Sequence, residues 1–263
     1  MALRKPSHDE VSPAPRYVPG EPLRVGAAII GAQKAGTTSL ASALSEHRQI
    51  CLASTKETHL FDDPMVQRNG PTLGDLERHF GHRRPGQILL DATPSYIYLN
   101  GSIDALLRHE PEVRLIAVLR SSVDRALSQY YHSRRHGLEH RSLISALALE
   151  PIRLRREREP LAADSSHRHH SYIDRGRYDR QLPRLLSMTP NLLVLDFEQL
   201  VTTPEKVVHE IFDFLDVDRV PVDSFPHLNR GRDSKSHVGR AFARARTFGS
   251  TRRMNRLLAG CDR

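Results

Sequence analysis

The 263-residue sequence contains few cysteines and no long hydrophobic segment. Cys51 and Cys261 are too few for a disulfide framework and too sparse for a cysteine-based zinc site, so we expect reduced thiols. The longest apolar runs fall far short of the roughly 20 residues that cross a bilayer. The first 24 residues are charged and rich in proline, and they lack the apolar core of a secretory signal. These absences predict a cytoplasmic protein with no membrane span.

Lysine is also scarce, although the chain is basic overall. The formal net charge is +8, and only five of the 39 basic residues are lysine, which leaves 34 arginines. Arginine binds phosphate groups through two parallel hydrogen bonds, so this composition suits a polyanionic ligand. The alternative to ligand binding is that most of these arginines lie on solvated surfaces and are frequent because the genome favours arginine. The sequence does not reveal the oligomeric state.

Short apolar runs alternate with amphipathic stretches from residue 23 onward. The runs predict strands at residues 23–30, 87–90, 113–119 and 192–195, and helices at residues 38–44, 103–109, 123–135, 178–186 and 204–215. Alternating strands and helices favour a parallel sheet covered on both faces. Proline breaks up residues 1–22, which we expect to form a flexible tail before a single domain at 23–263. Residues 140–170 predict a helix that runs into a mobile insertion.

The segment from Gly31 to Ser39 follows a predicted strand and opens a predicted helix. Backbone N–H groups at such a turn form a cradle for a phosphate. In an ATPase the lysine follows the second glycine, whereas here Lys34 lies inside the loop. A lysine at that place can reach the bridging oxygen of a leaving group. This position of the lysine disfavours the interpretation of the loop as an ATP-hydrolysing site. The residues expected to hold the anion are Lys34, Ala35, Gly36, Thr37, Thr38 and Ser39.

This loop resembles the 5′-phosphosulfate-binding loop of the sulfotransferases that use 3′-phosphoadenosine 5′-phosphosulfate. Arg120 and Ser128, eight residues apart at the end of a predicted strand and into a helix, resemble that family's 3′-phosphate-binding segment. A later basic segment resembles the loop that closes over the same phosphate, in two registers, 229–232 with Arg232 or 234–237. The resemblance covers residues 23–215 and fades afterwards, and residues 240–263 are a poor copy of the family's closing helix.

Residues 56–62 resemble the catalytic segment of the heparan-sulfate glucosaminyl sulfotransferase branch. By that resemblance Glu57 is the base that takes the acceptor's proton, and Lys34 neutralises charge on the leaving phosphate oxygen. His59 is a second base or orients the substrate, with a structural histidine as the equal alternative. The resemblance also implies acceptor-binding residues, although Ala92 stands where the glucosaminyl members usually have lysine. These residues are Asp62, Thr93, Pro94 and Ser95.

We therefore expect a P-loop-like three-layer α/β/α domain that transfers a sulfuryl group from the nucleotide to a hydroxyl or amine of a small-molecule or glycan acceptor. No metal and no nucleic acid is required. His167, His169 and His170 are contiguous without a carboxylate pattern, so a loop is favoured over a metal site. Two alternatives stay open. One is a P-loop kinase, with residues 89–91 as its Walker B strand, and the other is a non-catalytic polyanion-binding protein.

Overall fold

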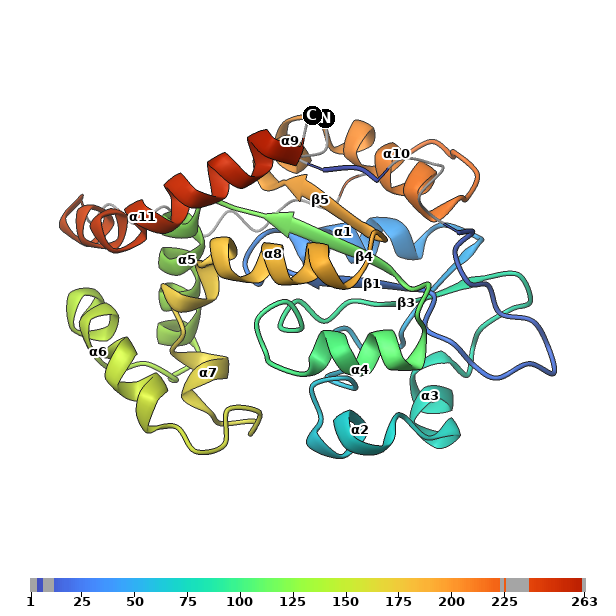
Figure 1. The fold of residues 1–263 in the computed structure, drawn as a ribbon, viewed down its shortest axis with the longest axis horizontal. Coiled ribbons are helices and arrows are strands. Elements are labelled where there is room, and N and C mark those ends of the chain that lie inside the picture. Colours follow the sequence, from blue (N-terminus) through green and yellow to red (C-terminus); the bar gives the residue numbers. More distant parts are fainter. Residues whose placement is uncertain (1–3, 7–11, 223–224, 226–236, 262–263) are drawn as a thin grey trace. The chain divides into compact units, whose positions relative to one another are not determined.

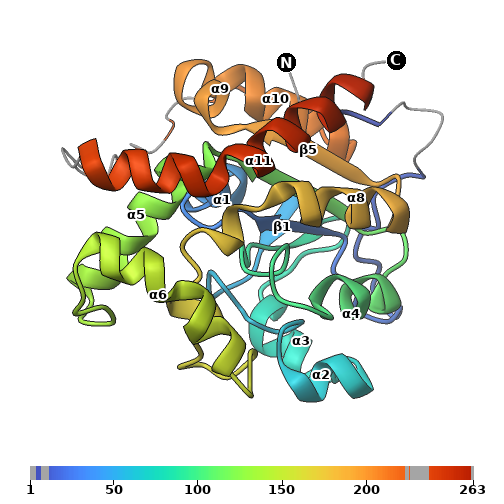
Figure 2. The ribbon, with the colours of Figure 1, turned by 60° about the vertical axis from the view of Figure 1, so that its left-hand side comes forward.

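The computed structural model describes residues 4–6, 12–222, 225 and 237–261 of the chain. The chain is divided into two compact units. The first unit comprises residues 1–119 and 186–228, and the second comprises residues 120–185 and 229–263. Figure 1 and Figure 2 show the elements coloured along the chain.

A five-stranded parallel sheet lies at the centre of the first unit (Figure 1). Its strand order is β2-β3-β1-β4-β5. The strands are β1 (Ala27–Gly31), β2 (Ile50–Leu52), β3 (Ile88–Asp91), β4 (Arg114–Leu119) and β5 (Leu192–Asp196). Every residue of β1, β3 and β4 is buried, as expected for parallel strands covered on both faces. The expected parallel sheet is confirmed, and it gains the three-residue strand β2, which is too short to stand out in the sequence.

Helices flank this sheet. In the first unit they are α1 (Thr37–Ser45), α2 (Pro64–Asn69), α3 (Leu73–Phe80), α4 (Ser102–His109), α9 (Phe197–Thr202) and α10 (Pro204–Leu215). Helix α1 contacts β1, β2 and α10, while α9 and α10 pack on β5. Helix α10 has Pro204 in its first turn and buries an apolar stripe that includes Val207, Ile211 and Leu215. Its bounds agree with the sequence prediction.

The segments that follow β1 and β3 leave the same edge of the sheet. The two strands are neighbours, and Ala28 of β1 is in register with Asp91 at the end of β3. Beyond β3 the chain turns back to β1, because the backbone N–H of Ile97 donates to the carbonyl of Ile30 at 2.9 Å. In open α/β sheets this carboxyl edge is where ligands bind.

The described part of the N-terminal segment lies against the first unit. Arg4 forms an antiparallel bridge with Val194 of β5, through hydrogen bonds of 3.2 and 3.0 Å. The N–H of Tyr17 donates to the carbonyl of Gln87 at 2.8 Å, and Ala14 is buried. Residues 12–22 therefore have defined contacts, and the flexibility expected of residues 1–22 stays a prediction.

The second unit is helical where the structure describes it. Its elements are α5 (Ser122–Arg135), α6 (Leu143–Arg156), α7 (Ser166–His169), a 3-10 turn (Asp174–Gly176), α8 (Tyr178–Met188, whose end belongs to the first unit) and α11 (His237–Cys261). A shared core includes Leu127, Tyr130, Leu147 and Tyr172, with Ala243 from α11. Helix α11 continues over residues whose composition made a closing helix doubtful from the sequence.

Residues 140–170 contain α6 and α7 and are tied to the rest of the second unit. Arg153 of α6 forms an ion pair with the buried Glu139, at 2.5 Å between Nη1 and Oε2. Glu150, also buried on α6, accepts hydrogen bonds from the backbone N–H groups of Ile173 and Asp174 at 2.7–2.9 Å. The mobility expected of this segment stays a prediction.

Among the described residues, no helix combines the length and the apolar composition needed to cross a membrane.

Candidate functional site

The loop between β1 and α1 is built around two residues with left-handed backbone conformation. Lys34 has φ 71°, and Gly36, the N-cap of α1, has φ 79°. At Gly31 the loop starts so close to Ile97 that an added Cβ would lie 2.5 Å from its Cγ2 atom. A larger residue there would displace the 92–97 turn or the loop, so the glycine is required by the close approach.

The N-cap residue of α1 is a glycine, which supplies no capping side chain, and the first turn of the helix carries no acidic residue. The N–H groups at a helix start have no partner within the helix, and the helix dipole favours negative charge there. Lys34 is partly buried, Ala35, Thr37 and Ser39 are buried, and Thr38 is exposed. This cradle, with a lysine on the loop and hydroxyls on the first turn, fits the phosphosulfate group that the sequence predicts.

Glu57 and His59 lie on a segment between β2 and α2 with an unusual backbone. Glu57 has φ 61° and His59 has φ 54°, although neither is glycine. The N–H of Glu57 donates to the carbonyl of Ala92 at 3.1 Å, so this segment is joined to the turn that follows β3. The Glu57 segment, the 92–97 turn and the start of the glycine loop are thus hydrogen-bonded in series within the first unit.

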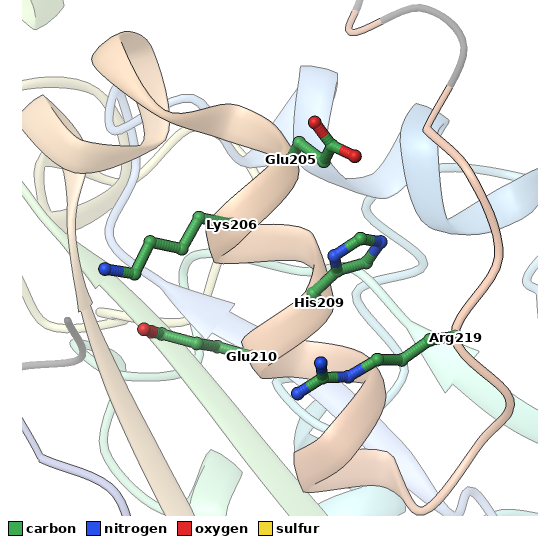
Figure 3. A pocket seen from close by; sticks show the side chains of 5 residues that line it. All are labelled: Glu205, Lys206, His209, Glu210 and Arg219. Carbon is green, nitrogen blue, oxygen red and sulfur yellow. The ribbon is translucent and has the colours of Figure 1, made fainter.

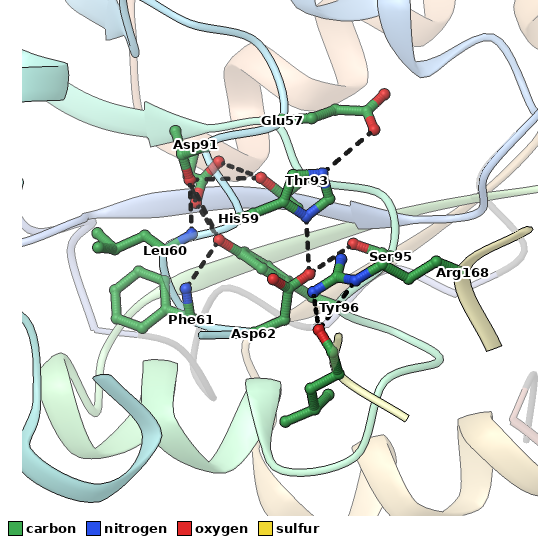
Figure 4. Close-up of polar contacts among 12 residues, drawn as sticks. Glu57, His59, Leu60, Phe61, Asp62, Asp91, Thr93, Ser95, Tyr96 and Arg168 are labelled. Atoms are coloured by element: carbon green, nitrogen blue, oxygen red, sulfur yellow. Dashed lines mark hydrogen bonds and ion pairs between the residues drawn. The ribbon is translucent and has the colours of Figure 1, made fainter. Parts of the chain in front are cut away.

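The side chains of Glu57, His59 and Asp62 form a row in which His59 lies between the two carboxylates and Asp62 is the buried end (Figure 4). His59 Nδ1 lies 2.9 Å from Asp62 Oδ2, and His59 Nε2 lies 3.9 Å from Glu57 Oε2. The side chain of Glu57 is 33% exposed and that of Asp62 is 0% exposed. Since a carboxylate only accepts hydrogen bonds, Asp62 orients the ring with a proton on Nδ1. Nε2 then faces the carboxylate predicted as the base.

Lys56 is a feature of this site that the sequence analysis did not identify. Its Nζ atom forms an ion pair with Glu57 Oε1, the oxygen of Glu57 that does not face His59. Glu57 therefore lies between a lysine ammonium and an imidazole. Lys56 holds one oxygen of Glu57, and the side chain remains 33% exposed, so a third group can approach the carboxylate and give up a proton to it.

The residues predicted to bind the acceptor are buried. Pro94 is buried, Thr93 is 0% exposed and Ser95 is 4% exposed. Ser95 Oγ donates to Asp62 Oδ2 at 2.9 Å, and Thr93 Oγ1 donates to Asp91 Oδ1 at 2.7 Å. Both hydroxyls thus have carboxylate partners inside the protein. Their contact with an acceptor stays a prediction.

The residues predicted to hold the 3′-phosphate belong to the second unit or lie outside the described chain. Arg120 directly precedes the N-cap of α5 and is partly buried, and Ser128 is a partly exposed residue within α5. Arg232 lies outside the described residues, as do the neighbouring residues of both registers, 229–232 and 234–236. The phosphate-binding role of these three residues stays a prediction.

The three histidines near residue 170 contact backbone carbonyl groups. His167, His169 and His170 each direct Nε2 to a backbone carbonyl, at 3.3, 2.7 and 3.0 Å. In the part of the chain that the structure describes, no group of three or more His, Cys, Asp or Glu residues is arranged to hold a metal ion.

A surface pocket on α10 is lined by none of the predicted site residues (Figure 3). Its lining mixes both charge signs, and Arg219 forms an ion pair with Asp213 at 2.6 Å. The residues that line it are Glu205, Lys206, His209, Glu210 and Arg219. Because this set contains none of the residues implicated above, the pocket does not enter the functional argument.

Comparison with known proteins identifies sulfotransferases as relatives of this chain. The chain is 29% identical over 224 residues to heparan sulfate glucosamine 3-O-sulfotransferase 6 of Homo sapiens, which covers 80% of this chain and 60% of that protein. It is 28% identical over 206 residues to heparan sulfate glucosamine 3-O-sulfotransferase 3B1 of Mus musculus, covering 78% of this chain and 49% of the relative. The chain therefore spans about half to three fifths of the length of these curated relatives.

Solved structures show the same architecture. The crystal structure of a sulfotransferase from Alicyclobacillus acidocaldarius matches with a TM-score of 0.74 at 26% identity, over 92% of this chain and 100% of that one. The expected P-loop-like α/β/α fold is confirmed. The family model described as "Sulfotransferase domain" matches residues 27–227, well over half of the sequence, and the chain belongs to that sulfotransferase family.

Proposed function

We propose that the protein transfers a sulfuryl group from 3′-phosphoadenosine 5′-phosphosulfate to a hydroxyl of a carbohydrate acceptor. Family membership supports sulfuryl transfer rather than the phosphoryl transfer of a P-loop kinase. The relatives named above act on heparan sulfate glucosamine, which supports a sugar hydroxyl as the acceptor. One observation carries the proposal. A partly exposed carboxylate, Glu57, and a lysine-bearing anion cradle lie at the same sheet edge, linked by hydrogen bonds through the 92–97 turn.

The residues that would hold the donor nucleotide are those that the family resemblance implies. In the first unit, Lys34 and the backbone N–H groups of Gly36 and Thr37 face the phosphosulfate, with Ala35, Thr38 and Ser39 completing the turn. By the family resemblance, Arg120, Ser128 and Arg232 would take the 3′-phosphate. The bound nucleotide supplies the sulfuryl group and a stable phosphate leaving group.

Two side chains carry the charge changes. An acceptor hydroxyl must lose its proton as its oxygen bonds to sulfur, and the carboxylate of Glu57, whose side chain is 33% exposed, would receive that proton. The positive charge of Lys34 Nζ stabilises the negative charge that develops on the departing phosphate oxygen. His59 Nε2, held through Nδ1 by the buried Asp62, lies beside Glu57 and limits the directions in which the carboxylate can turn. No metal is needed for these two steps.

The proposal is tested with radiolabelled sulfate donor and a panel of glycan, lipid and phenol acceptors. We expect transfer to a glycan, and binding of adenosine 3′,5′-bisphosphate in calorimetry without Mg²⁺. Preference for ATP with Mg²⁺ would support the kinase alternative instead.

The Glu57→Gln variant isolates the base in the same assays. It should lose turnover at least a hundredfold while its affinity for adenosine 3′,5′-bisphosphate stays within about twofold, because general-base catalysis contributes on the order of 10²–10⁴. Glu46→Gln, an exposed carboxylate at the end of α1, is the matched control and should behave as wild type. Normal turnover by Glu57→Gln would remove Glu57 from the base role.

A further inference from the structure

A second buried carboxylate, Asp91, lies beneath the segment that carries Glu57 and His59. Asp91 is the last residue of β3 and is 1% exposed. It accepts hydrogen bonds from three hydroxyls: Thr58 Oγ1 at 2.9 Å, Thr93 Oγ1 at 2.7 Å and Tyr96 OH at 2.7 Å (Figure 4). Three donors on one carboxylate make an internally satisfied network at the sheet edge, in which only Thr58 comes from the Glu57 segment.

The network also engages the backbone of the same segment. Thr58 Oγ1 accepts from the N–H of Leu60 at 3.2 Å, and Tyr96 OH accepts from the N–H of Phe61 at 3.1 Å. Burial raises the pKa of Asp91, and its hydroxyl partners counter that rise. Burial and the neighbouring Asp91 raise the pKa of Tyr96 well above its usual value, so this phenol remains a donor.

Thr58 stands between the two residues with left-handed backbone, Glu57 and His59. Non-glycine residues keep such conformations only where the surroundings over-determine them. Thr58 supplies that constraint, because its hydroxyl is fixed by Asp91 while its neighbours direct their side chains toward each other. If Thr58 lost this anchor, the segment would relax toward ordinary backbone angles and Glu57 would turn away from His59.

We propose that Asp91 is a positioning residue for Glu57, which it holds in place through Thr58, and that the hydroxyls of Thr93 and Tyr96 complete this anchor rather than contact the acceptor. The inference rests on the proposed function in one respect, the role of Glu57 as the base. The hydrogen bonds that anchor the segment do not depend on that function. By this proposal, the turn after β3 serves to align the carboxylate of Glu57. A displacement of about 1 Å in a reacting group costs on the order of a hundredfold in rate, so loss of the anchor should be visible in kcat.

Thr58→Val is the test, because valine keeps the branched shape and removes only the hydroxyl. Thr58→Ser keeps the hydroxyl and should recover activity. Thr72→Val is the matched control: Thr72 Oγ1 also donates to an aspartate, Asp75 Oδ2 at 2.6 Å, in the same unit but at the exposed start of α3. Each variant is assayed for kcat, for the KM of the sulfate donor, and for affinity toward adenosine 3′,5′-bisphosphate.

We expect Thr58→Val to lower kcat at least tenfold with the donor KM and nucleotide affinity within about twofold, and Thr58→Ser to stay within about threefold of wild type in kcat. Thr72→Val should leave kcat unchanged. Asp91→Asn, which keeps the shape but removes the charge, should lower kcat in the same selective way. A Thr58→Val enzyme with wild-type kcat would overturn the proposal. So would a loss of kcat matched by an equal loss of nucleotide affinity, since that would indicate general damage to the unit.

Hydrogen exchange separates this inference from the proposed function. In Thr58→Val the amides of residues 57–62 should exchange at least tenfold faster, while amides of β1 and β4 keep their wild-type rates. Wild-type protein that transfers no sulfate to any acceptor would refute the proposed function, and faster exchange in residues 57–62 would still support the anchor. Unchanged exchange in this segment would refute the anchor whatever the activity.

Discussion

Replacing Asp62 by asparagine tests whether the row of Glu57, His59 and Asp62 works as a unit. Asp62 Oδ2 accepts both from His59 Nδ1 and from Ser95 Oγ, each at 2.9 Å, and its side chain is 0% exposed. The amide oxygen of asparagine can occupy the same place and accept both hydrogen bonds. The substitution therefore removes the negative charge while these two hydrogen bonds can still form.

The expected size of the effect follows from that loss of charge. A hydrogen bond to a charged group contributes about 1.5–3 kcal/mol, against about 0.5–1.5 kcal/mol for a neutral one. The orientation of His59 should thus lose about 1–2 kcal/mol, which corresponds to roughly a 5- to 30-fold decrease in kcat. Because Asp62 is buried, no water molecule can take over the interaction that its charge made with His59.

The assay measures sulfate transfer and, separately, binding of adenosine 3′,5′-bisphosphate by calorimetry. We expect the decrease in kcat with the nucleotide affinity within about twofold. Ser95→Ala, which removes the other donor to Asp62 and leaves His59 its partner, should cost less than Asp62→Asn. Unchanged kcat in Asp62→Asn would refute the reasoning, because it would mean that the orientation of His59 does not affect the step that limits turnover.

Three further predictions concern the loop and the second unit. Lys34→Ala should weaken nucleotide binding and lower kcat/KM by about 3 kcal/mol, roughly a hundredfold, as measured in the transfer assay, and an unchanged rate would contradict the leaving-group role. Gly31→Ala should lower the free energy of unfolding by about 1–3 kcal/mol, because its Cβ would lie 2.5 Å from Ile97 Cγ2. The double variant Gly31→Ala/Ile97→Ala should lose less stability in thermal unfolding than the sum of the two single variants, because Ile97→Ala removes that clash. Burial raises the pKa of Glu150 from 4.5 to about 7, so the folded protein binds this proton more tightly than the unfolded chain and the contribution of Glu150 to stability falls as pH rises from 4.5 to about 7. Glu150→Gln, which mimics the protonated form, should match wild type at pH 4 and be more stable at pH 8 by up to about 3 kcal/mol, measured as the difference between the two unfolding curves; no difference at pH 8 would contradict the raised pKa.

The regular elements that are long or strongly patterned are predictable from the sequence. The strands at β3, β4 and β5 and helix α10 lie where apolar runs and the proline signal put them. The three-residue strand β2 and the short helices α2, α3 and α9 were not predicted, because segments of three to eight residues carry too few apolar positions to define a period. Helix α11 was not predicted, because residues 240–263 are a poor copy of the family's closing helix, and the glycines at 239, 249 and 260 lower the helix propensity of the segment.

The features of the candidate site also fall into those that the sequence predicts and those that it does not. The glycine loop with Lys34 is recognisable because the turn needs particular residues at particular spacings, and the residues 57, 59 and 62 are recognisable as a short motif. The hydrogen-bond partners of these residues cannot be recognised from the sequence. Ser95 and Asp62 are 33 positions apart, and so are Thr58 and Asp91. The resemblance placed Thr93 and Ser95 in the acceptor site, which stays a prediction, and the structure adds that their hydroxyls donate to the buried carboxylates of Asp91 and Asp62.

By itself, the sequence determined the family, the parallel sheet and the identity of the candidate lysine and glutamate, because these depend on local patterns of burial and on residues close together in the chain. Only the tertiary structure decided which atoms face Glu57, that Asp62 is the buried end of its row, and that Asp91 anchors Thr58. The physical reason is that the strand order puts β3 beside β1 and β2, which brings segments distant in sequence within hydrogen-bond reach.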